Sequence, residues 1–250
     1  MFPSILLDRV VGEEGLSPRA YHRGGNYDIM LLFAHRGWSA RHSENSCAAF
    51  RAAAGQRIAG CECDVRLTSD GAVVVCHDAD LRRWGGSRRP LAQRTLAEVQ
   101  ADGLPRLEEV LDILQHQTLL VEIKPHGGPA HTEALVRRTV AILSHAQAEE
   151  RAALLCFQVG PLALAARLAP GLRRVRNVEG IPNDPRWADA QRSCWAVDGD
   201  HTRLEAPAVD LLRERGVQVF AYTVNTRRDA ERCRRLGLSG IISNHADLWS

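Results

Sequence analysis

Short apolar runs alternate with amphipathic stretches from residue 29 to the end of the chain. The runs are four to eight residues long and are mostly built from valine, isoleucine, leucine and aromatic residues, which is typical of strands. The predicted strands cover residues 29–34, 58–65, 72–76, 119–123, 153–157, 174–178, 194–197, 217–224 and 240–243.

The segments between these runs carry the signals of helices. Residues 44–55 ("ENSCAAFRAAAG") begin with cap-type residues and end at a glycine. In residues 225–237 ("NTRRDAERCRRLG"), Thr226 and Asp229 have the spacing of a capping box, and the segment again ends at a glycine. Residues 131–146 and 206–216 repeat their apolar positions every three or four residues. Each of these segments is predicted to be a helix.

Strand and helix alternation over this length predicts a parallel sheet. The run 72–76 breaks the pattern, because it follows 58–65 through a link too short for a parallel crossover, and Asp70-Gly71 is a strong hairpin signal. Without that arm eight strands remain, the number that a (β/α)₈ TIM barrel needs. We therefore expect a TIM barrel with a β-hairpin extension after the second strand, with a doubly wound open sheet as the alternative. Residues 1–28 are predicted to be an N-terminal extension and 29–250 a single domain.

Composition adds little to this picture but excludes some classes of protein. The formal net charge is only +2, which gives no reason to expect a nucleic-acid partner. The seven cysteines are an odd number, none is spaced C-x-x-C, and most lie in apolar runs, which favours a reducing, cytoplasmic location. No apolar run is long enough for a membrane span, so no stable membrane association is expected.

Polar side chains recur where the predicted strands end. His35 follows the first strand, Glu62 and Asp64 lie near the end of the second, and Glu122 and Lys124 end the strand at 119–123. Active sites of TIM barrels lie at the carboxyl ends of the strands. These side chains are therefore the candidate functional residues.

Glu62 and Asp64 are two residues apart, so both project from one face of a strand while Cys61 and Cys63 project from the other. Two acids on a buried face repel each other and are costly to desolvate. A divalent cation would offset both effects, and carboxylate oxygens suit Mg²⁺ or Ca²⁺. The alternative is that one acid pairs with an arginine while the other reaches solvent.

The hairpin brings a second histidine toward these acids. If Asp70-Gly71 form a two-residue turn, Asp64 faces His77 across the ladder, with both side chains on the same face. A slip of one residue would turn His77 to the other face.

Two histidines beside three acids suit general acid and base catalysis. Arg36 and Lys124 would add positive charge for an anionic group. The set predicts metal-assisted phosphoryl transfer or phosphoester hydrolysis. The chain has neither a G-x-x-x-x-G-K-[ST] loop nor a G-x-S-x-G elbow, which argues against an NTPase and a serine hydrolase.

At these residues the chain resembles the glycerophosphodiester phosphodiesterase family. The matching segments are "AHRGWSARHSENSCAAFRAAAG" (34–55), "CECDVRLTSDGAVVVCHDADLRR" (61–83), "GLPRLEEVLDIL" (103–114), "VEIK" (121–124), "VFAYTVN" (219–225) and "GLSGIISNHADL" (237–248). The resemblance implies a TIM barrel that cleaves glycerophosphodiesters, such as glycerophosphocholine, to glycerol 3-phosphate and an alcohol.

The resemblance also implies a role for each matching residue. His35 and His77 would be the acid–base pair, and Arg36 and Lys124 would hold the phosphodiester. The ligands of one divalent metal, Mg²⁺ or Ca²⁺, would be Glu62, Asp64 and Glu122.

Further matches and departures lie around this set. Glu44 and Asn45 belong to the second family motif, near the substrate. Tyr222 stands where the family usually has tryptophan, which would reshape the surface that packs on the alcohol or the glycerol. Asn244 replaces the usual aspartate after the last strand and removes a charge from the rim of the site.

Two other functions remain open at this point, together with the alcohol moiety, the metal and the oligomeric state. One is a lysophospholipase D-like lipid phosphodiesterase, and the other is a non-catalytic barrel that binds phosphoesters. The tripeptide His-Arg-Gly also occurs twice, at residues 22–24 and 35–37. Only the second copy follows a predicted strand, so we expect His35 to be essential for turnover and His22 to be dispensable.

Overall fold

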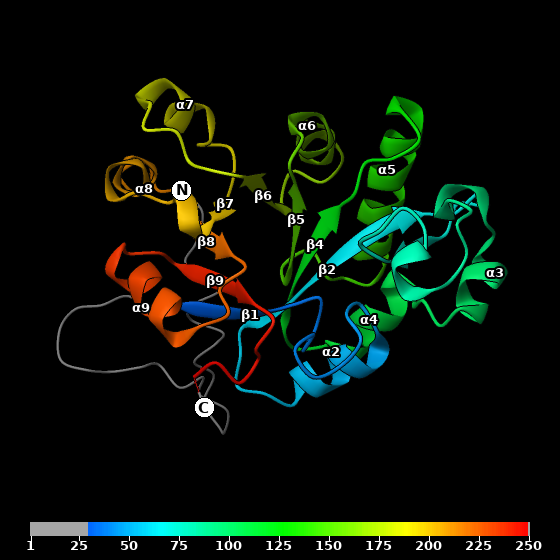
Figure 1. Ribbon diagram of the computed structural model, residues 1–250. Coiled ribbons are helices and arrows are strands. Elements are labelled where there is room, and N and C mark those ends of the chain that lie inside the picture. The colour runs from blue at the N-terminus through cyan, green and yellow to red at the C-terminus, as the bar shows by residue number, and fades with distance from the viewer. Residues whose placement is uncertain (1–29, 250) are drawn as a thin grey trace.

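Eight parallel strands close into a barrel in the computed structural model, which describes residues 30–249 (Figure 1). The barrel strands are β1 (Leu31–His35), β2 (Gly60–Leu67), β4 (Thr118–Ile123), β5 (Ala152–Cys156), β6 (Arg173–Val178), β7 (Ala196–Asp200), β8 (Gln218–Tyr222) and β9 (Gly240–Ser243). Because β1 pairs with both β2 and β9, the sheet is closed, which confirms the TIM barrel over the open sheet. The predicted extension of residues 1–28, with the first copy of the tripeptide, lies outside the described residues.

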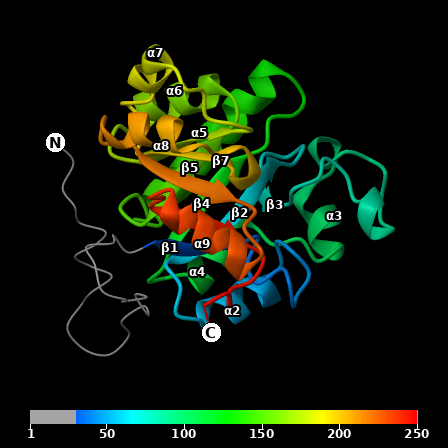
Figure 2. The same ribbon diagram turned by 60° about the vertical axis from the view of Figure 1, so that its left-hand side comes forward.

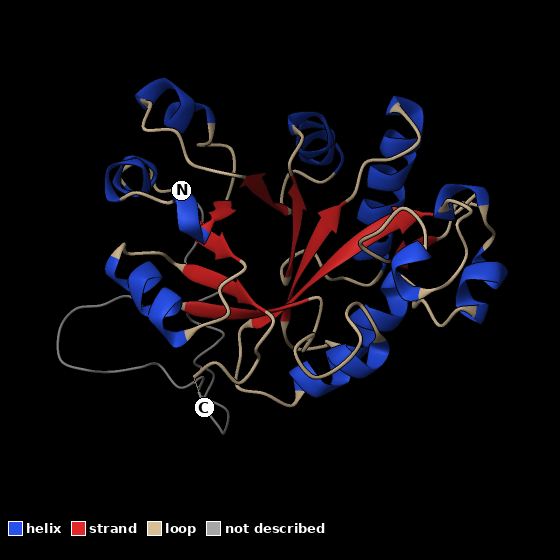
Figure 3. Ribbon diagram, in the orientation of Figure 1, coloured by secondary structure: helices blue, strands red, loops and turns tan. Residues whose placement is uncertain are grey.

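Helices surround the strands on the outside of the barrel (Figure 3). They are α2 (Cys47–Ala54), α3 (Leu96–Ala101), α4 (Leu107–Ile113), α5 (Pro129–His145), α6 (Val159–Leu168), α7 (Pro185–Ala190), α8 (Ala206–Arg213) and α9 (Arg227–Arg235). Two predicted caps are confirmed, since Ser46 accepts a hydrogen bond from the backbone of Ala49 and Thr226 accepts one from Asp229. Among the described residues, no helix combines the length and the apolar character needed to cross a bilayer.

Alternation along the strands divides the apolar side chains into two layers. Phe33, Leu120, Leu155 and Phe220 belong to the cluster that fills the barrel interior. Neighbouring positions on the strands belong to the larger cluster beneath the helices, which includes Cys61 and Cys63. The two cysteines thus lie on the opposite face of β2 from Glu62 and Asp64, as predicted.

The hairpin after β2 differs from the prediction in its register. The short strand β3 (Val73–Val75) pairs antiparallel with β2, but Asp64 lies opposite Cys76, whose backbone N–H donates to the Asp64 carbonyl at 2.9 Å. The expectation that Asp64 faces His77 across the ladder is therefore wrong. The reason is a three-residue turn, Ser69–Gly71, in place of a two-residue one, with Gly71 in the left-handed region at a φ of 82°.

A small lobe follows β3 and stands beside the barrel next to α3 (Figure 2). It contains the short 3₁₀ helices η1 (Arg82–Trp84) and η2 (Leu91–Gln93). Its own apolar cluster includes Val74, Leu91 and Val99. The lobe holds β3, and with it the segment that carries His77, against the barrel.

Gly60 allows β2 and β4 to approach each other at the start of both strands. A Cβ atom at Gly60 would lie 1.8 Å from the carbonyl oxygen of Thr118, its partner in the register. We expect Gly60→Ala to lower the free energy of unfolding by about 1–3 kcal/mol or more, because the backbones must separate. Urea denaturation measures this. The control is Gly160→Ala in α6, where a Cβ meets nothing within 4 Å and should be neutral or stabilising. Equal stability of the wild type and Gly60→Ala would contradict the packing argument.

Candidate active site

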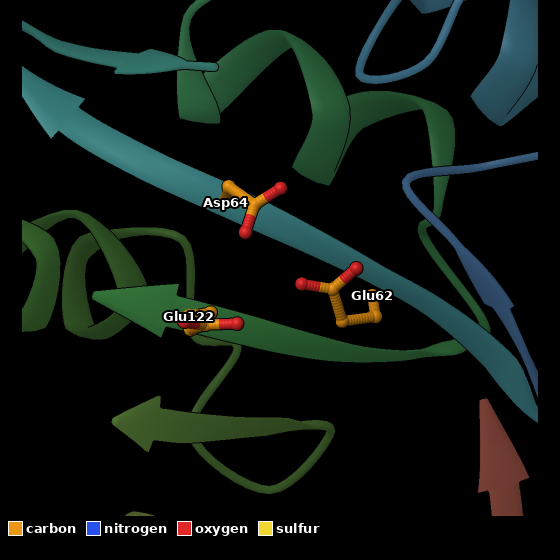
Figure 4. A group of neighbouring side chains, drawn as sticks. All are labelled: Glu62, Asp64 and Glu122. Atoms are coloured by element: carbon orange, nitrogen blue, oxygen red, sulfur yellow. The ribbon is translucent and has the colours of Figure 1, made fainter. Parts of the chain in front are cut away.

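Three carboxyl groups from β2 and β4 converge inside the barrel (Figure 4). Glu62 and Asp64 come from β2 and Glu122 from β4, where the register pairs Asp64 with Glu122. One oxygen from each side chain lies within 4.8 Å of the others, and all three residues are buried. The structure thus brings together the three acids that the sequence selected as metal ligands.

The electrostatics of this triad favour a bound cation. Burial, followed by the charges of Asp64 and Glu122, raises the pKa of Glu62 well above its usual value. Oε1 of Glu62 is buried and has no hydrogen-bond partner among the described residues. Burial also acts to raise the pKa of Asp64, but the charges of Lys124 and Arg36 outweigh it and lower that pKa. Three buried oxygen ligands, one of them unpartnered, fit a hard divalent ion such as Mg²⁺ or Ca²⁺.

Two cationic side chains lie against the triad. Lys124 Nζ is 2.5 Å from Glu122 Oε1 and 3.0 Å from Asp64 Oδ1, and Arg36 Nε is 3.0 Å from Asp64 Oδ2. The two contacts to Asp64 are ion pairs and are not aligned as hydrogen bonds. The backbone N–H of Arg36 donates to Glu62 Oε2 at 3.1 Å, from a left-handed conformation at a φ of 56°. Two cations beside an acidic site are suited to an anionic substrate that also contacts a metal.

Glu44 and Asn45 form hydrogen bonds with two residues of the site, Arg36 and Asp64. Glu44 Oε1 accepts a hydrogen bond from Arg36 Nη1 at 2.8 Å and another from Arg83. Asn45 is buried, and its Nδ2 donates to Asp64 Oδ2 at 2.9 Å. In the structure these two residues therefore position Arg36 and Asp64.

His35 is held by a residue from the far end of the chain. Its Nδ1 lies 2.6 Å from Asn244 Oδ1, and its Nε2 lies 3.9 Å from Glu62 Oε2. Asn244 is itself fixed, because its backbone N–H donates to Asn225 Oδ1 at 2.9 Å. With the amide oxygen as acceptor, Nδ1 carries the proton and Nε2 presents a lone pair. Burial, together with the charge of Arg36, lowers the pKa of His35 to about 4.

His77 lies near Asp64, although it does not pair with Asp64 across the ladder as predicted. It follows β3, and its backbone carbonyl accepts a hydrogen bond from Arg66 Nε at 2.9 Å. Its Nδ1 lies 2.8 Å from Asp78 Oδ1, and its charge contributes to the low pKa of Asp64. The two histidines thus flank the triad and have different partners, an amide for His35 and a carboxylate for His77.

Tyr222 ends β8 and packs edge-on against Phe157, with 6.0 Å between the ring centroids. Its hydroxyl donates to the carbonyl of Val178 at 2.8 Å. The ring therefore has a fixed orientation at the end of its strand. Its contact with substrate stays a prediction.

Sequence reasoning did not recognise the partners of the histidines. The sequence predicts only the loss of a charge at Asn244, and it gives Asp78 only as part of a motif. The available signal for Asp78 was its position directly after His77, whereas Asn244 is separated from His35 by 209 residues. That contact depends on the closure of the barrel by β1 and β9.

Comparison with protein-family models matches residues 35–248 to the glycerophosphoryl diester phosphodiesterase family. Among curated relatives, a glycerophosphodiester phosphodiesterase of Caldanaerobacter subterraneus is 26% identical over 227 residues, which is 86% of this chain and 93% of the relative. A glycerophosphodiester phosphodiesterase of Bacillus altitudinis is 25% identical over 235 residues, covering 86% of this chain and 95% of the relative.

Solved structures give the same result. An Oleispira antarctica phosphodiesterase, in complex with the product sn-glycerol-3-phosphate, superposes with a TM-score of 0.79 at 26% identity over 86% of this chain and 93% of that one. A glycerophosphodiester phosphodiesterase of Thermotoga maritima superposes with a TM-score of 0.73 at 24% identity, over 91% of this chain and 98% of that one, and supports the fold.

Proposed function

The chain belongs to the glycerophosphoryl diester phosphodiesterase family, and from this premise we propose that it hydrolyses glycerophosphodiesters to glycerol 3-phosphate and an alcohol with one divalent metal ion and two histidines. Family membership supports the reaction class. The metal and the individual residue roles are our proposal for this chain.

One observation carries the proposal: two histidines and two cations surround a buried triad of carboxylates. A protein gains no stability from three acids that repel each other inside a barrel, since burying charge without compensation is costly. The arrangement is explained if Glu62, Asp64 and Glu122 hold a cation, beside which Arg36 and Lys124 bind the anionic phosphodiester. When bound, a divalent ion would polarise the phosphoryl oxygens and stabilise negative charge there.

The partners of the two histidines suggest how the acid and base roles are divided. His35 is kept neutral by burial and has its Nε2 lone pair free, so we assign it the general base that takes a proton from the water that attacks the phosphorus atom. Burial lowers the pKa of His77, and the carboxylates of Asp64 and of Asp78, the latter at its Nδ1, act in the opposite direction and favour the charged imidazole. We assign it the general acid that protonates the departing alkoxide at Nε2.

The direct test is hydrolysis of glycerophosphocholine by the purified protein in the presence of Mg²⁺ or Ca²⁺. The expected result is release of glycerol 3-phosphate, which is measured by coupling it to a dehydrogenase that oxidises this product. Tight binding of the diester without turnover would favour the non-catalytic barrel. If glycerophosphocholine is neither bound nor hydrolysed with either ion, the proposal is wrong.

A lipid substrate is the second candidate, and one surface feature favours it. A groove of about 530 Å³ between α5 and α6 begins at Pro125 and His126, next to Lys124. Leu164 and Val136 line part of it, and Val159 nearby is exposed. A lysophospholipase D would use such a groove for an acyl chain. Comparing turnover of lysophosphatidylcholine and glycerophosphocholine decides between the two, and we expect the deacylated substrate to be preferred.

Asn244 gives a further prediction for the proposed base. Asn244→Ala removes the acceptor that orients His35, so we expect kcat to fall by about 10- to 100-fold, part of the gain that a positioned base supplies. Asn244→Asp restores the acceptor and should recover most of the turnover. Because a carboxylate raises the pKa of His35, the acidic limb of the kcat/KM profile should move to higher pH in that variant. Unchanged kcat in Asn244→Ala would contradict the role of Asn244.

The proposal extends to location and domain structure. The cysteines are all free, which is consistent with a cytoplasmic protein. We propose residues 29–250 as a single catalytic domain that acts on a small-molecule phosphodiester without nucleic acid.

A further inference from the structure

Two polar residues lie inside the barrel without a structural reason. Val175 and Ala196 belong to the interior cluster, so Asn177 and Asp198, two residues further along β6 and β7, face the interior as well. The parallel register pairs Asn177 directly with Asp198. Both side chains thus stand next to each other, one strand apart, on the inner wall.

Both residues are buried and incompletely partnered. Asn177 is 2% exposed and Asp198 is 1% exposed. The Oδ1 atom of each is buried and has no hydrogen-bond partner among the described residues. Buried polar oxygens in native proteins nearly always accept a hydrogen bond, so two adjacent exceptions indicate that a donor from outside the chain is expected there.

The pair is close to the candidate active site. The charge of Glu122 adds to the effect of burial in raising the pKa of Asp198, and burial, followed by the charge of Asp198, raises the pKa of Tyr222. Along β7 and β8, Asp198 lies opposite Phe220 and Asp200 lies opposite Tyr222, so Asp198 is one layer deeper than the end of β8. The pair therefore lies on the β6–β7 side of the interior that the metal-binding acids share.

The chemistry of the two oxygens selects what can bind them. A phosphoryl group offers only acceptor oxygens and no donor to these atoms, and a quaternary ammonium has no N–H to donate. A vicinal diol offers two O–H donors on adjacent carbons. We propose that Asn177 and Asp198 form a hydroxyl-binding subsite that holds the glycerol diol of the substrate. This inference rests on the proposed function. It adds the two residues that would distinguish a glycerophosphodiester from other phosphodiesters by its glycerol diol.

The test measures binding rather than turnover, so that it stays separate from the proposed reaction. The protein with Mg²⁺ is titrated calorimetrically with sn-glycerol 3-phosphate and with n-propyl phosphate, which lacks both hydroxyls. We expect the wild type to bind glycerol 3-phosphate about tenfold more tightly or better, the effect of two hydrogen bonds. In Asn177→Leu and Asp198→Leu the ratio should fall toward one, while the affinity for propyl phosphate changes by less than about twofold.

The matched control is Thr139→Val in α5, which also removes a buried oxygen without a partner among the described residues, but from a helix outside the barrel. It should leave the ratio unchanged. Because each leucine variant replaces an unpartnered oxygen by an apolar group, its thermal midpoint should be unchanged or higher. If a leucine variant does not fold, Asp198→Ala, which also removes the oxygen, gives the second measurement and should lower the ratio.

The outcomes separate this subsite from the reaction. A wild type that binds both ligands equally, or variants that keep the wild-type ratio, would overturn the subsite and leave a buried water as the partner of these oxygens. A protein that discriminates between the ligands but does not cleave glycerophosphocholine keeps the subsite and contradicts only the proposed reaction.

Discussion

Alanine at position 35 is expected to lower the turnover of glycerophosphocholine by at least about 10²–10⁴-fold, the contribution of a positioned acid or base. His35 is the side chain whose Nε2 faces the triad, 3.9 Å from Glu62, while its other nitrogen is held by Asn244. If the triad holds its cation and His77 serves as the acid, no other base remains beside the substrate, because Arg36 stays protonated. The measurement is kcat under saturating substrate and metal.

The repeated tripeptide supplies the control for this experiment. His22→Ala removes the same side chain from the other His-Arg-Gly copy and should leave kcat almost unchanged. Equal thermal midpoints for both variants would exclude unfolding as the cause of any loss. Turnover that survives both His35→Ala and chelation of the metal is incompatible with the proposed mechanism.

The barrel was predictable because each of its strands is a short run whose neighbours carry clear helix signals. Residues 119–123 and 240–243, for example, became strands with almost the predicted bounds. The hairpin register was not predictable from Asp70-Gly71 alone, because two-residue and three-residue turns share that signal. The extra residue shifts the ladder by one position, yet His77 still approaches Asp64 because it lies beyond the last ladder pair, in a segment held by Arg66.

The acids of the site were predictable because they lie on strands, where the alternation of side chains determines which face they occupy. The groups that position them were harder to find. Asn244 meets His35 only when the barrel closes. Asp198 was missed for a different reason: the predicted strand 194–197 stopped where the apolar run stopped, whereas β7 continues to Asp200. An acid followed by a glycine is typical of a loop, and only the pairing of β7 with β6 and β8 shows that Asp198 points into the barrel.

Removal of the metal ion is expected to abolish turnover, and Glu62→Gln should have the same effect in the presence of the ion. Glu62 carries the buried Oε1 without a partner among the described residues, so its neutral analogue loses a ligand charge without a change of shape. Loss of a carboxylate ligand should weaken Mg²⁺ or Ca²⁺ binding by at least about 10–100-fold, the range seen even for groups that only support ligands. Calorimetric titration with each ion measures this directly.

The effect of the ion on the free energy of unfolding gives a second test of the metal site, and this test does not depend on activity. An ion at 100 times its Kd stabilises the native wild type by about 2.7 kcal/mol, which a thermal or urea transition detects. Without the ion, Glu62→Gln should be as stable as the wild type or more stable, because burial and the charges of Asp64 and Glu122 disfavour the ionised carboxylate that it replaces. The control Glu231→Gln alters a partly exposed acid on α9, away from the barrel interior, and should keep the full stabilisation by the ion. If neither ion stabilises the wild type, or if Glu62→Gln is stabilised equally, the triad does not bind a divalent metal.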